Sequence, residues 1–233
     1  MLHLNVLEKA GLAVAAISGL SDGDCASRTE ATPSRNAFLE KCAIFPKRLA
    51  RARQVHGTVI HAVDEEYLKN HPGGIPDSWP PGDGLITNLP GVALGISVAD
   101  CVPLWIFDPV RRALGLFHAG REGTVAGMAG AGVQAMGETY GSCPTDLLCV
   151  IGPSAGPCCY EVAQEMAEYL RERGFPVSGR NLDLWETNRR QLGLSGAVPD
   201  HVYTTGHCTL CGDLFHSYRK SGTVERNLAV AML

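Results

Sequence analysis

The sequence predicts an α/β fold built on a mixed sheet. Three apolar runs follow one another closely, at residues 92–98, 102–107 and 113–117, and their length and content of branched and aromatic side chains are typical of buried strands. Two longer segments, 123–140 and 162–173, carry apolar residues at helical spacing. With 233 residues, 45% of them hydrophobic, the chain can bury a full core in which helices cover the sheet faces.

The remaining elements follow in chain order. Segment 49–55 resembles a strand, and the many prolines and glycines of residues 70–84 predict an irregular loop. Asp108-Pro109 and Arg111-Arg112 predict a hairpin turn between the second and third apolar runs, and Thr124 is a candidate N-cap for a helix over 123–140. We expect further strands at 147–151, 202–204 and 227–232, and another helix at 182–192.

Composition excludes several classes of partner. The net charge is −4 and there is no basic run, so we expect no nucleic-acid binding. The longest apolar stretches, such as 11–20, fall well short of the roughly 20 residues of a membrane span. We expect no signal peptide, because charged residues precede the first apolar segment and no small-residue cleavage site follows it. Nine irregularly spaced cysteines argue against a disulfide framework, so we expect a cytoplasmic protein.

Three short motifs carry donors for a metal ion. His56, Cys101 and His118 each stand beside turn residues near the end of an apolar run. Two imidazoles and one thiolate are a good ligand set for Zn²⁺, and three protein ligands leave a fourth position for water or substrate, as in catalytic zinc sites. The predicted hairpin brings Cys101 and His118 to the same end of the sheet, but spacing alone does not place His56 beside them.

The same residues allow a second interpretation. A cysteine beside a histidine is also the minimal nucleophile–base pair, in which the Cys101 thiolate attacks and the His118 imidazole transfers the proton. Asp100 would then orient the histidine. Taken singly, a cysteine such as Cys101 is more often a buried, inert thiol, and a histidine such as His56 is more often a polar residue at a strand end. The spacing does not separate a zinc site from a thiol hydrolase.

Four further cysteines have no obvious partner. Cys208 and Cys211 form a C-x-x-C pair, as in one half of a zinc ribbon or in a redox pair, but the chain has no second pair of that spacing and no thioredoxin-like strand and helix before it. Cys158 and Cys159 are adjacent, so both sulfurs are hard to direct into one tetrahedral site. We therefore expect a structural or incidental role for these residues.

Taken together, the motifs resemble one family, the laccase-domain family of the YfiH type, also called polyphenol oxidase-like or peptidoglycan editing factor. Seven motifs stand in the order of that family: Gln54-Val55-His56-Gly57, Asp83-Gly84-Leu85-Ile86-Thr87, Ala99-Asp100-Cys101-Val102-Pro103, His118-Ala119-Gly120, the segment from Ile151-Gly152-Pro153 to Cys158-Cys159-Tyr160-Glu161-Val162, Asp183-Leu184-Trp185 with Asn188, and Ser217-Tyr218-Arg219. The resemblance spans about residues 50–233 and is weak before residue 45.

The resemblance implies a four-layer α/β/β/α sandwich and a single domain over residues 1–233 whose first ~45 residues are shortened or divergent. It implies a Zn²⁺ cofactor held by His56, Cys101 and His118. It also implies an enzyme that acts on small molecules, a purine nucleoside and phosphate: phosphorolysis of adenosine, inosine and methylthioadenosine, and deamination of adenosine. A homodimer is compatible with the sequence, which does not fix the oligomeric state.

We assign further roles on the same basis. Asp83, Asp100 and Cys101 are the candidate catalytic residues, and Gln54 and Arg121 are the candidate substrate-binding residues. The multicopper label of the family is not supported, because blue-copper and trinuclear sites need many histidines in His-x-His pairs and this chain has eight histidines with no such pair.

The chain departs from the family pattern at three places. The family continues its His-Ala-Gly motif with Trp-Arg-Gly, whereas this chain has Arg121-Glu122-Gly123. A Ser-Thr-Arg motif near the N-terminus is absent, and Ser18-Gly19-Leu20-Ser21 stands roughly in its place. His216 stands where phenylalanine is usual. If the missing arginines bind phosphate, phosphorolysis should be slower than deamination.

Two alternatives to the nucleoside phosphorylase remain open: a Cys–His hydrolase acting on muropeptide-type amides, and a non-catalytic zinc-stabilised module.

Overall fold

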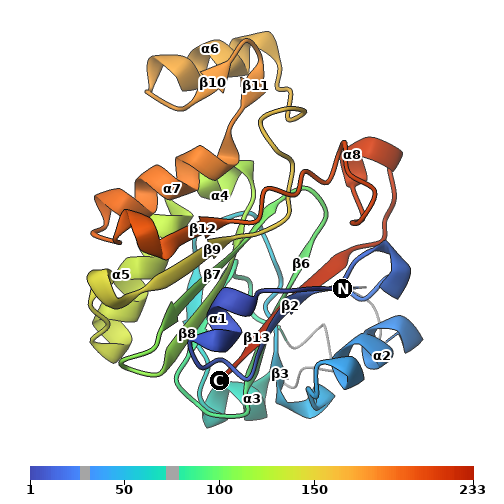
Figure 1. The fold of residues 1–233 in the computed structure, drawn as a ribbon, viewed down its shortest axis with the longest axis vertical. Helices are drawn as coiled ribbons and strands as arrows, with labels where there is room; N and C mark the ends of the chain where they lie inside the picture. The colour runs from blue at the N-terminus through green and yellow to red at the C-terminus, as the bar shows by residue number, and fades with distance from the viewer. Residues whose placement is uncertain (27–31, 72–78) are drawn as a thin grey trace.

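Two mixed β-sheets form the centre of the molecule (Figure 1). The structure is a computed structural model that describes residues 1–26, 32–71 and 79–233. The first sheet has the strand order β1 (Leu2–His3), β2 (Val14–Ile17), β13 (Asn227–Met232), β6 (Ala93–Val98) and β3 (Leu49–Ala50). The second has the order β12 (Val202–Thr204), β9 (Leu148–Ile151), β7 (Val102–Asp108), β8 (Ala113–Ala119), β5 (Gly84–Thr87) and β4 (Ile60–Ala62). Both sheets contain parallel and antiparallel pairs.

The alternation of side chains along each strand produces four layers. On β2, Ile17 faces the second sheet, whereas Val14 packs in the separate core beneath α2 (Pro33–Lys41). On β7, Trp105 lies in the core between the sheets and Ile106 in the core beneath the outer helices. Because successive residues of a strand point to opposite faces, each sheet contributes to two cores. The predicted α/β/β/α sandwich is confirmed.

Some of the helices cover the outer faces of the sheets (Figure 1). The helices besides α2 are α1 (Asn5–Lys9), α3 (Glu65–Asn70), α4 (Arg121–Val125), α5 (Met128–Tyr140), α6 (Gln164–Glu172), α7 (Leu184–Leu194) and α8 (Tyr218–Ser221). Helices α5 and α7 pack on the second sheet, and α2 on the first. Helix α6 carries the small hairpin of β10 (Val177–Ser178) and β11 (Asn181–Leu182) beside it. No helix within the described segments has the length and apolar character of a membrane span.

The predicted helix over 123–140 is two helices. Gly127 has φ of +92°, a left-handed conformation that separates α4 from α5, and such a conformation favours glycine. Thr124 is therefore not an N-cap: it lies inside α4, and its hydroxyl donates to the Ala119 carbonyl at 3.1 Å. The buried apolar residues of α5 nevertheless face the sheet, as their spacing predicted.

Two further differences from the expectations concern short strands. The strand-like segment 49–55 pairs with β6 only through Leu49 and Ala50, and the chain then leaves the sheet. Strand β2 was not predicted. The loop predicted over residues 70–84 falls largely on 72–78, outside the described residues, and ends where β5 begins at Gly84. Strand β13, from the C-terminal part of the chain, pairs with both β2 from the N-terminal part and β6.

Candidate active site

The register of the β7–β8 hairpin brings Cys101 close to His118. Val102 pairs with Ala119 and Pro103 with His118, so Cys101, one residue before β7, lies opposite Gly120, one residue after β8. A Cβ atom on Gly120 would lie 2.9 Å from the Cys101 Sγ, which means that a side chain there would collide with the thiol. The predicted approach of Cys101 and His118 is therefore confirmed, and it depends on a glycine at the turn.

Asp83 holds the third donor in place. His56 lies in the loop between β3 and β4, in a left-handed conformation with φ of +63°. The Asp83 carboxylate accepts the backbone N–H groups of Val55 at 3.1 Å, His56 at 3.0 Å and Gly57 at 2.8 Å. Because Asp83 directly precedes β5, which pairs with β8, this carboxylate clamps the His56 loop against the strand that carries His118.

The three predicted metal ligands converge. The ligand atoms of His56, Cys101 and His118 all lie within 4.8 Å of one another, and the two imidazole rings meet edge to face with centroids 4.9 Å apart. The His118 Nδ1 donates to Asp83 Oδ1 at 2.8 Å, which fixes the tautomer and directs Nε2 toward the other donors. A carboxylate behind a metal-binding histidine is the usual outer-shell partner of such a ligand.

The charges around Cys101 favour its thiolate form. Burial raises the pKa of Cys101, but the neighbouring His118 and His56 imidazoles outweigh it and lower this pKa to about 6. Burial lowers the pKa of His118, and the Cys101 and Asp83 charges outweigh that effect and raise it to about 9. Metals bind the deprotonated thiol, which the lowered pKa of Cys101 favours, whereas the raised pKa of His118 means that this imidazole must release a proton when a metal binds.

The donors open into a cavity of about 280 Å³. This volume is close to the lower end of small-molecule sites, roughly 300–1,000 Å³. The cavity combines the three metal donors with cationic and aromatic side chains from distant parts of the chain. Its lining residues are Gln54, His56, Ser97, Ala99, Asp100, Cys101, His118, Arg121, Tyr160, Leu184, Tyr218, Arg219 and Arg226.

Two of the predicted site residues bind mainly to the protein itself. Asp100 is buried, and its carboxylate accepts the hydroxyls of Thr209 and Ser217, both at 2.6 Å, and the Arg219 backbone N–H at 2.8 Å. The Gln54 amide makes two hydrogen bonds of 2.8 Å with the Ser97 backbone on β6. Both residues line the cavity, and these contacts hold its walls together. Their roles in chemistry stay predictions.

The sequence did not reveal how many guanidinium groups reach the cavity. Arg121 lines it as expected and pairs with the exposed Glu122 carboxylate at 3.2 Å. Arg219 and Arg226 line it as well, and neither had been singled out. Arg219 stood in a recognised motif, but nothing in the sequence placed Arg226 here. The cavity therefore contains three cationic groups despite the departure at Arg121-Glu122.

Replacing Gly120 by alanine is expected to weaken metal binding by about 10- to 100-fold, the usual effect of disturbing the surroundings of a metal ligand. The new Cβ would lie 2.9 Å from the Cys101 Sγ and 3.3 Å from the His56 Cδ2, so both donors must shift. Competition titration with a chromogenic chelator measures the affinity. Gly193→Ala is the matched control, because no atom lies within 4 Å of the added Cβ on α7. Unchanged affinity in Gly120→Ala would contradict the close packing of these donors.

The chain is similar to known proteins over most of its length. The family described as "Multi-copper polyphenol oxidoreductase laccase" matches residues 18–233. A protein of Geobacillus stearothermophilus named purine nucleoside phosphorylase YlmD is 36% identical over 223 residues, covering 91% of this chain and 81% of that protein.

Two solved structures share the fold. The crystal structure of YlmD from Geobacillus stearothermophilus superposes with a TM-score of 0.85 at 32% identity and covers 94% of this chain and 91% of that one. The structure of the hypothetical protein YfiH of Bacillus licheniformis gives a TM-score of 0.79 at 30% identity, covering 86% and 79% of the two chains. The chain therefore belongs to the laccase-like family of YlmD and YfiH, the family described as multi-copper polyphenol oxidoreductase laccases.

Proposed function

We propose that the protein is a zinc-dependent purine nucleoside phosphorylase that acts on adenosine, inosine and methylthioadenosine and also deaminates adenosine. The observation that carries this proposal is the cavity in which His56, Cys101 and His118 converge beside three arginines. The names of its relatives support the phosphorylase activity. The zinc ion, the deaminase activity and the individual substrates rest on the chemistry of the cavity and on the resemblance of the motifs.

The donor set fits zinc. Two imidazoles and a thiolate with a lowered pKa match the ligands of catalytic zinc sites, and the cavity leaves room for a further ligand. Zinc bound there would act as a Lewis acid, able to polarise an oxygen or to lower the pKa of a bound water to about 7. The Asp83 carboxylate orients His118 for this role through the hydrogen bond to Nδ1.

The arginines suit the phosphate. In phosphorolysis a phosphate oxygen attacks the ribose C1′, the bond from C1′ to the purine nitrogen breaks, and the purine leaves with a proton. The anionic nucleophile must be held against the sugar, and guanidinium groups bind phosphate oxygens through paired, charge-assisted hydrogen bonds. Arg121, Arg219 and Arg226 supply such groups on the wall of one cavity.

Aromatic side chains suit the base. Tyr160 and Tyr218 line the same cavity, and the Arg219 guanidinium lies 4.4 Å above the Tyr160 ring. Tyrosine rings of this kind stack on a purine and contribute about 1–3 kcal/mol per base. Asp100 is proposed to position these groups, because its carboxylate holds the segment from Thr209 to Arg219. We assign the same positioning role to Asp83.

One observation favours a second candidate function. In space, His118 lies between Asp83 and Cys101: its Nδ1 donates to the Asp83 carboxylate, and its imidazole lowers the pKa of Cys101 to about 6. A thiolate, an imidazole and an orienting carboxylate are the parts of a Cys–His hydrolase, which would cleave a muropeptide-type amide.

Chelation and alkylation separate these functions. Removal of zinc with a strong chelator is expected to abolish phosphorolysis of inosine, and added Zn²⁺ should restore it, because the open metal position is part of the reaction site. Cleavage of a muropeptide amide that survives chelation but is lost after treatment with iodoacetamide would instead support the thiol hydrolase. If zinc is bound but no nucleoside or muropeptide is turned over, the remaining interpretation is a zinc-stabilised binding module.

Replacing Arg219 or Arg226 by glutamine is expected to raise the KM for phosphate by about 10- to 100-fold, since a hydrogen bond between charged groups contributes about 1.5–3 kcal/mol. Adenosine deamination, which needs no phosphate, should change much less. Steady-state kinetics with varied phosphate measures the effect, and Arg190→Gln, on the exposed face of α7 where Arg190 pairs with Glu186, is the control. Equal losses in both reactions would show that these arginines do not select phosphate.

A further inference from the structure

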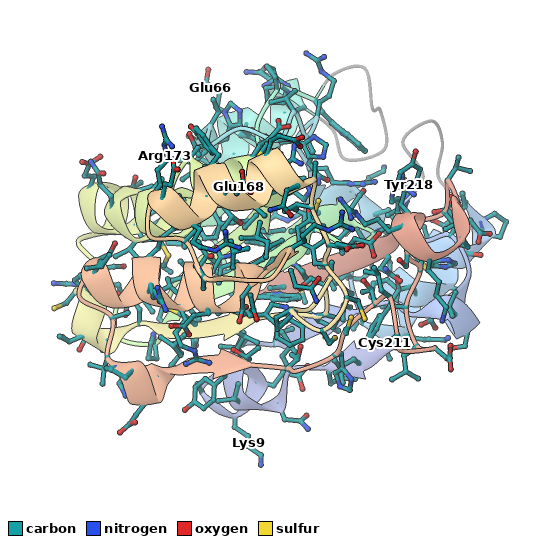
Figure 2. All side chains as sticks on the ribbon, turned by 90° about the horizontal axis from the view of Figure 1, so that it is seen from above. Lys9, Glu66, Glu168, Arg173, Cys211 and Tyr218 are labelled. Carbon is teal, nitrogen blue, oxygen red and sulfur yellow. The ribbon has the colours of Figure 1, made fainter. Side chains whose placement is uncertain are left out.

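A second cluster of metal-binding side chains lies outside the cavity. The sulfur atoms of Cys158, Cys159, Cys208 and Cys211 all lie within 4.8 Å of one another. None of the four lines the cavity that holds His56 and His118. Figure 2 shows Cys211 in the C-terminal segment that also carries Tyr218. The sequence led us to expect a structural or incidental role for these cysteines, and the structure brings all four sulfurs together.

The topology of the second sheet explains this convergence. Strands β9 and β12 are parallel neighbours, so the segments that follow them leave the sheet at the same edge. The two segments continue side by side: the Ser154 N–H donates to the His207 carbonyl at 3.1 Å, and the Thr209 N–H donates to the Ser154 carbonyl at 2.9 Å. Cysteines about fifty residues apart in sequence are therefore neighbours in space.

Local turns direct the four cysteine sulfurs toward one another. The Gly156 carbonyl accepts the backbone N–H groups of Cys159 at 3.0 Å and Tyr160 at 2.9 Å, which curls the chain around the adjacent cysteines. In the other segment the Gly212 N–H donates to the Cys208 carbonyl at 3.0 Å and closes a turn across the C-x-x-C pair. The sequence indicated that the sulfurs of adjacent cysteines are hard to direct into one site, and the tight turn is what brings both into the cluster.

The spacing is that of metal ligands rather than of a disulfide. Zinc–sulfur bonds are about 2.3 Å long, so two sulfurs on a tetrahedral zinc are about 3.8 Å apart. The Sγ atoms of Cys158 and Cys211 are 3.7 Å apart, whereas a disulfide requires about 2.05 Å. The Gly156 N–H also donates to the Cys208 sulfur at 3.3 Å, a contact that favours a thiolate.

We propose that Cys158, Cys159, Cys208 and Cys211 bind one structural zinc ion. Four thiolates select a soft or borderline metal, and a complete set of four protein ligands leaves no open position for a substrate. The ion joins a segment that lines the cavity to a segment that holds one of the lining residues in place. Tyr160 directly follows Cys159 and lines the cavity, and the Thr209 hydroxyl, next to Cys208, binds the Asp100 carboxylate. This second zinc fixes the wall of the site without taking part in its chemistry.

Metal analysis of the full chain, purified with a thiol reductant, tests the proposal. We expect two zinc ions per chain in the unmutated protein. The His118→Ala variant should keep the ion bound by the four cysteines, and the double variant Cys208→Ser with Cys211→Ser should keep only the ion at the cavity. Cys143→Ser, which alters an exposed cysteine outside the cluster, is the matched control and should keep both.

Spectroscopy identifies the ligands even if the double variant does not fold. X-ray absorption at the zinc edge of the unmutated protein should give a mean of about 2.5 sulfur ligands per zinc, from four at one site and one at the other. Cobalt exchanged into the His118→Ala variant should show the strong sulfur-to-metal charge-transfer bands of a four-thiolate site. A reduced, folded His118→Ala protein that binds neither zinc nor cobalt would overturn the proposal. So would a disulfide among these cysteines together with only one sulfur per zinc.

Discussion

Replacing His118 by alanine is expected to remove one zinc ion per chain and to lower the turnover of inosine and adenosine by more than about 100-fold. Disturbing an outer-shell partner alone costs about 10- to 100-fold, so the loss of a ligand costs more. His118 is only 3% exposed, and its imidazole links Asp83 to the metal donors. Cys101→Ser should have the same effect, because a hydroxyl replaces a thiolate.

Metal content by mass spectrometry and steady-state rates measure these effects. Cys143→Ser and His3→Ala are the matched controls, since both alter exposed residues outside the cavity and should keep full zinc content and activity. A His118→Ala or Cys101→Ser protein that retains all of its zinc would show that the ligands are assigned wrongly.

The part of this site that could be predicted is the part set by local strand pairing. A short turn after Asp108 fixes the register of the β7–β8 hairpin, where Asp108 Oδ1 accepts the N–H groups of Val110 and Arg111. Once that register is known, Cys101 and His118 must meet at the far end of the hairpin. The apolar runs were recognisable as strands because almost every residue in them is buried on both faces.

His56 was recognised as a donor, but its position beside Cys101 and His118 could not be predicted from spacing, because that position depends on a long-range contact. His56 reaches the site through the Asp83 carboxylate, 27 residues further along the chain. Its left-handed conformation, with φ of +63°, has no clear signature in a non-glycine residue. Spacing patterns report local periodicity and carry no information about such a contact.

Arg226 and the cysteine cluster were missed for the same reason. Arg226 reaches the cavity because β13 pairs with β6, whose C-terminal end borders the cavity at Ser97. The four cysteines meet because β9 and β12 are parallel neighbours, although β12 was recognised only as a short closing strand. In both cases the sequence identified the elements but not their order in the sheets, and that order creates the sites.

Replacing Asp83 by asparagine is expected to lower both the stability of the protein and its affinity for zinc at the cavity. Burial raises the pKa of Asp83, but the hydrogen bonds from His118 and from the Gly57 and Val55 N–H groups outweigh it and lower the pKa. The ionised carboxylate accepts four hydrogen bonds, three of them from backbone N–H groups. An asparagine NH₂ group turns toward some of these donors and leaves them without an acceptor.

Each buried donor without an acceptor costs about 1–3 kcal/mol, so one or two of them lower the free energy of unfolding by about 1–6 kcal/mol. For a chain of this length that corresponds to a fall in Tm of roughly 2–24 °C. Zinc affinity should fall by about 10- to 100-fold, since His118 loses its orienting partner and the His56 loop loses its clamp. Thermal unfolding and chelator competition measure the two effects separately.

Asp108→Ala separates loss of stability from loss of the metal site. Asp108 is also fully buried and also accepts backbone N–H groups, but it lies at the turn of the hairpin, at the end opposite His118. This variant should unfold at a lower temperature and still bind zinc at the cavity with unchanged affinity. If Asp83→Asn behaves in the same way, then Asp83 only stabilises the fold. If only Asp83→Asn loses zinc affinity, the Asp83 carboxylate both joins the His56 loop to the β5–β8 edge and orients the metal ligand His118. Metal binding then depends on the long-range contact between Asp83 and the His56 loop.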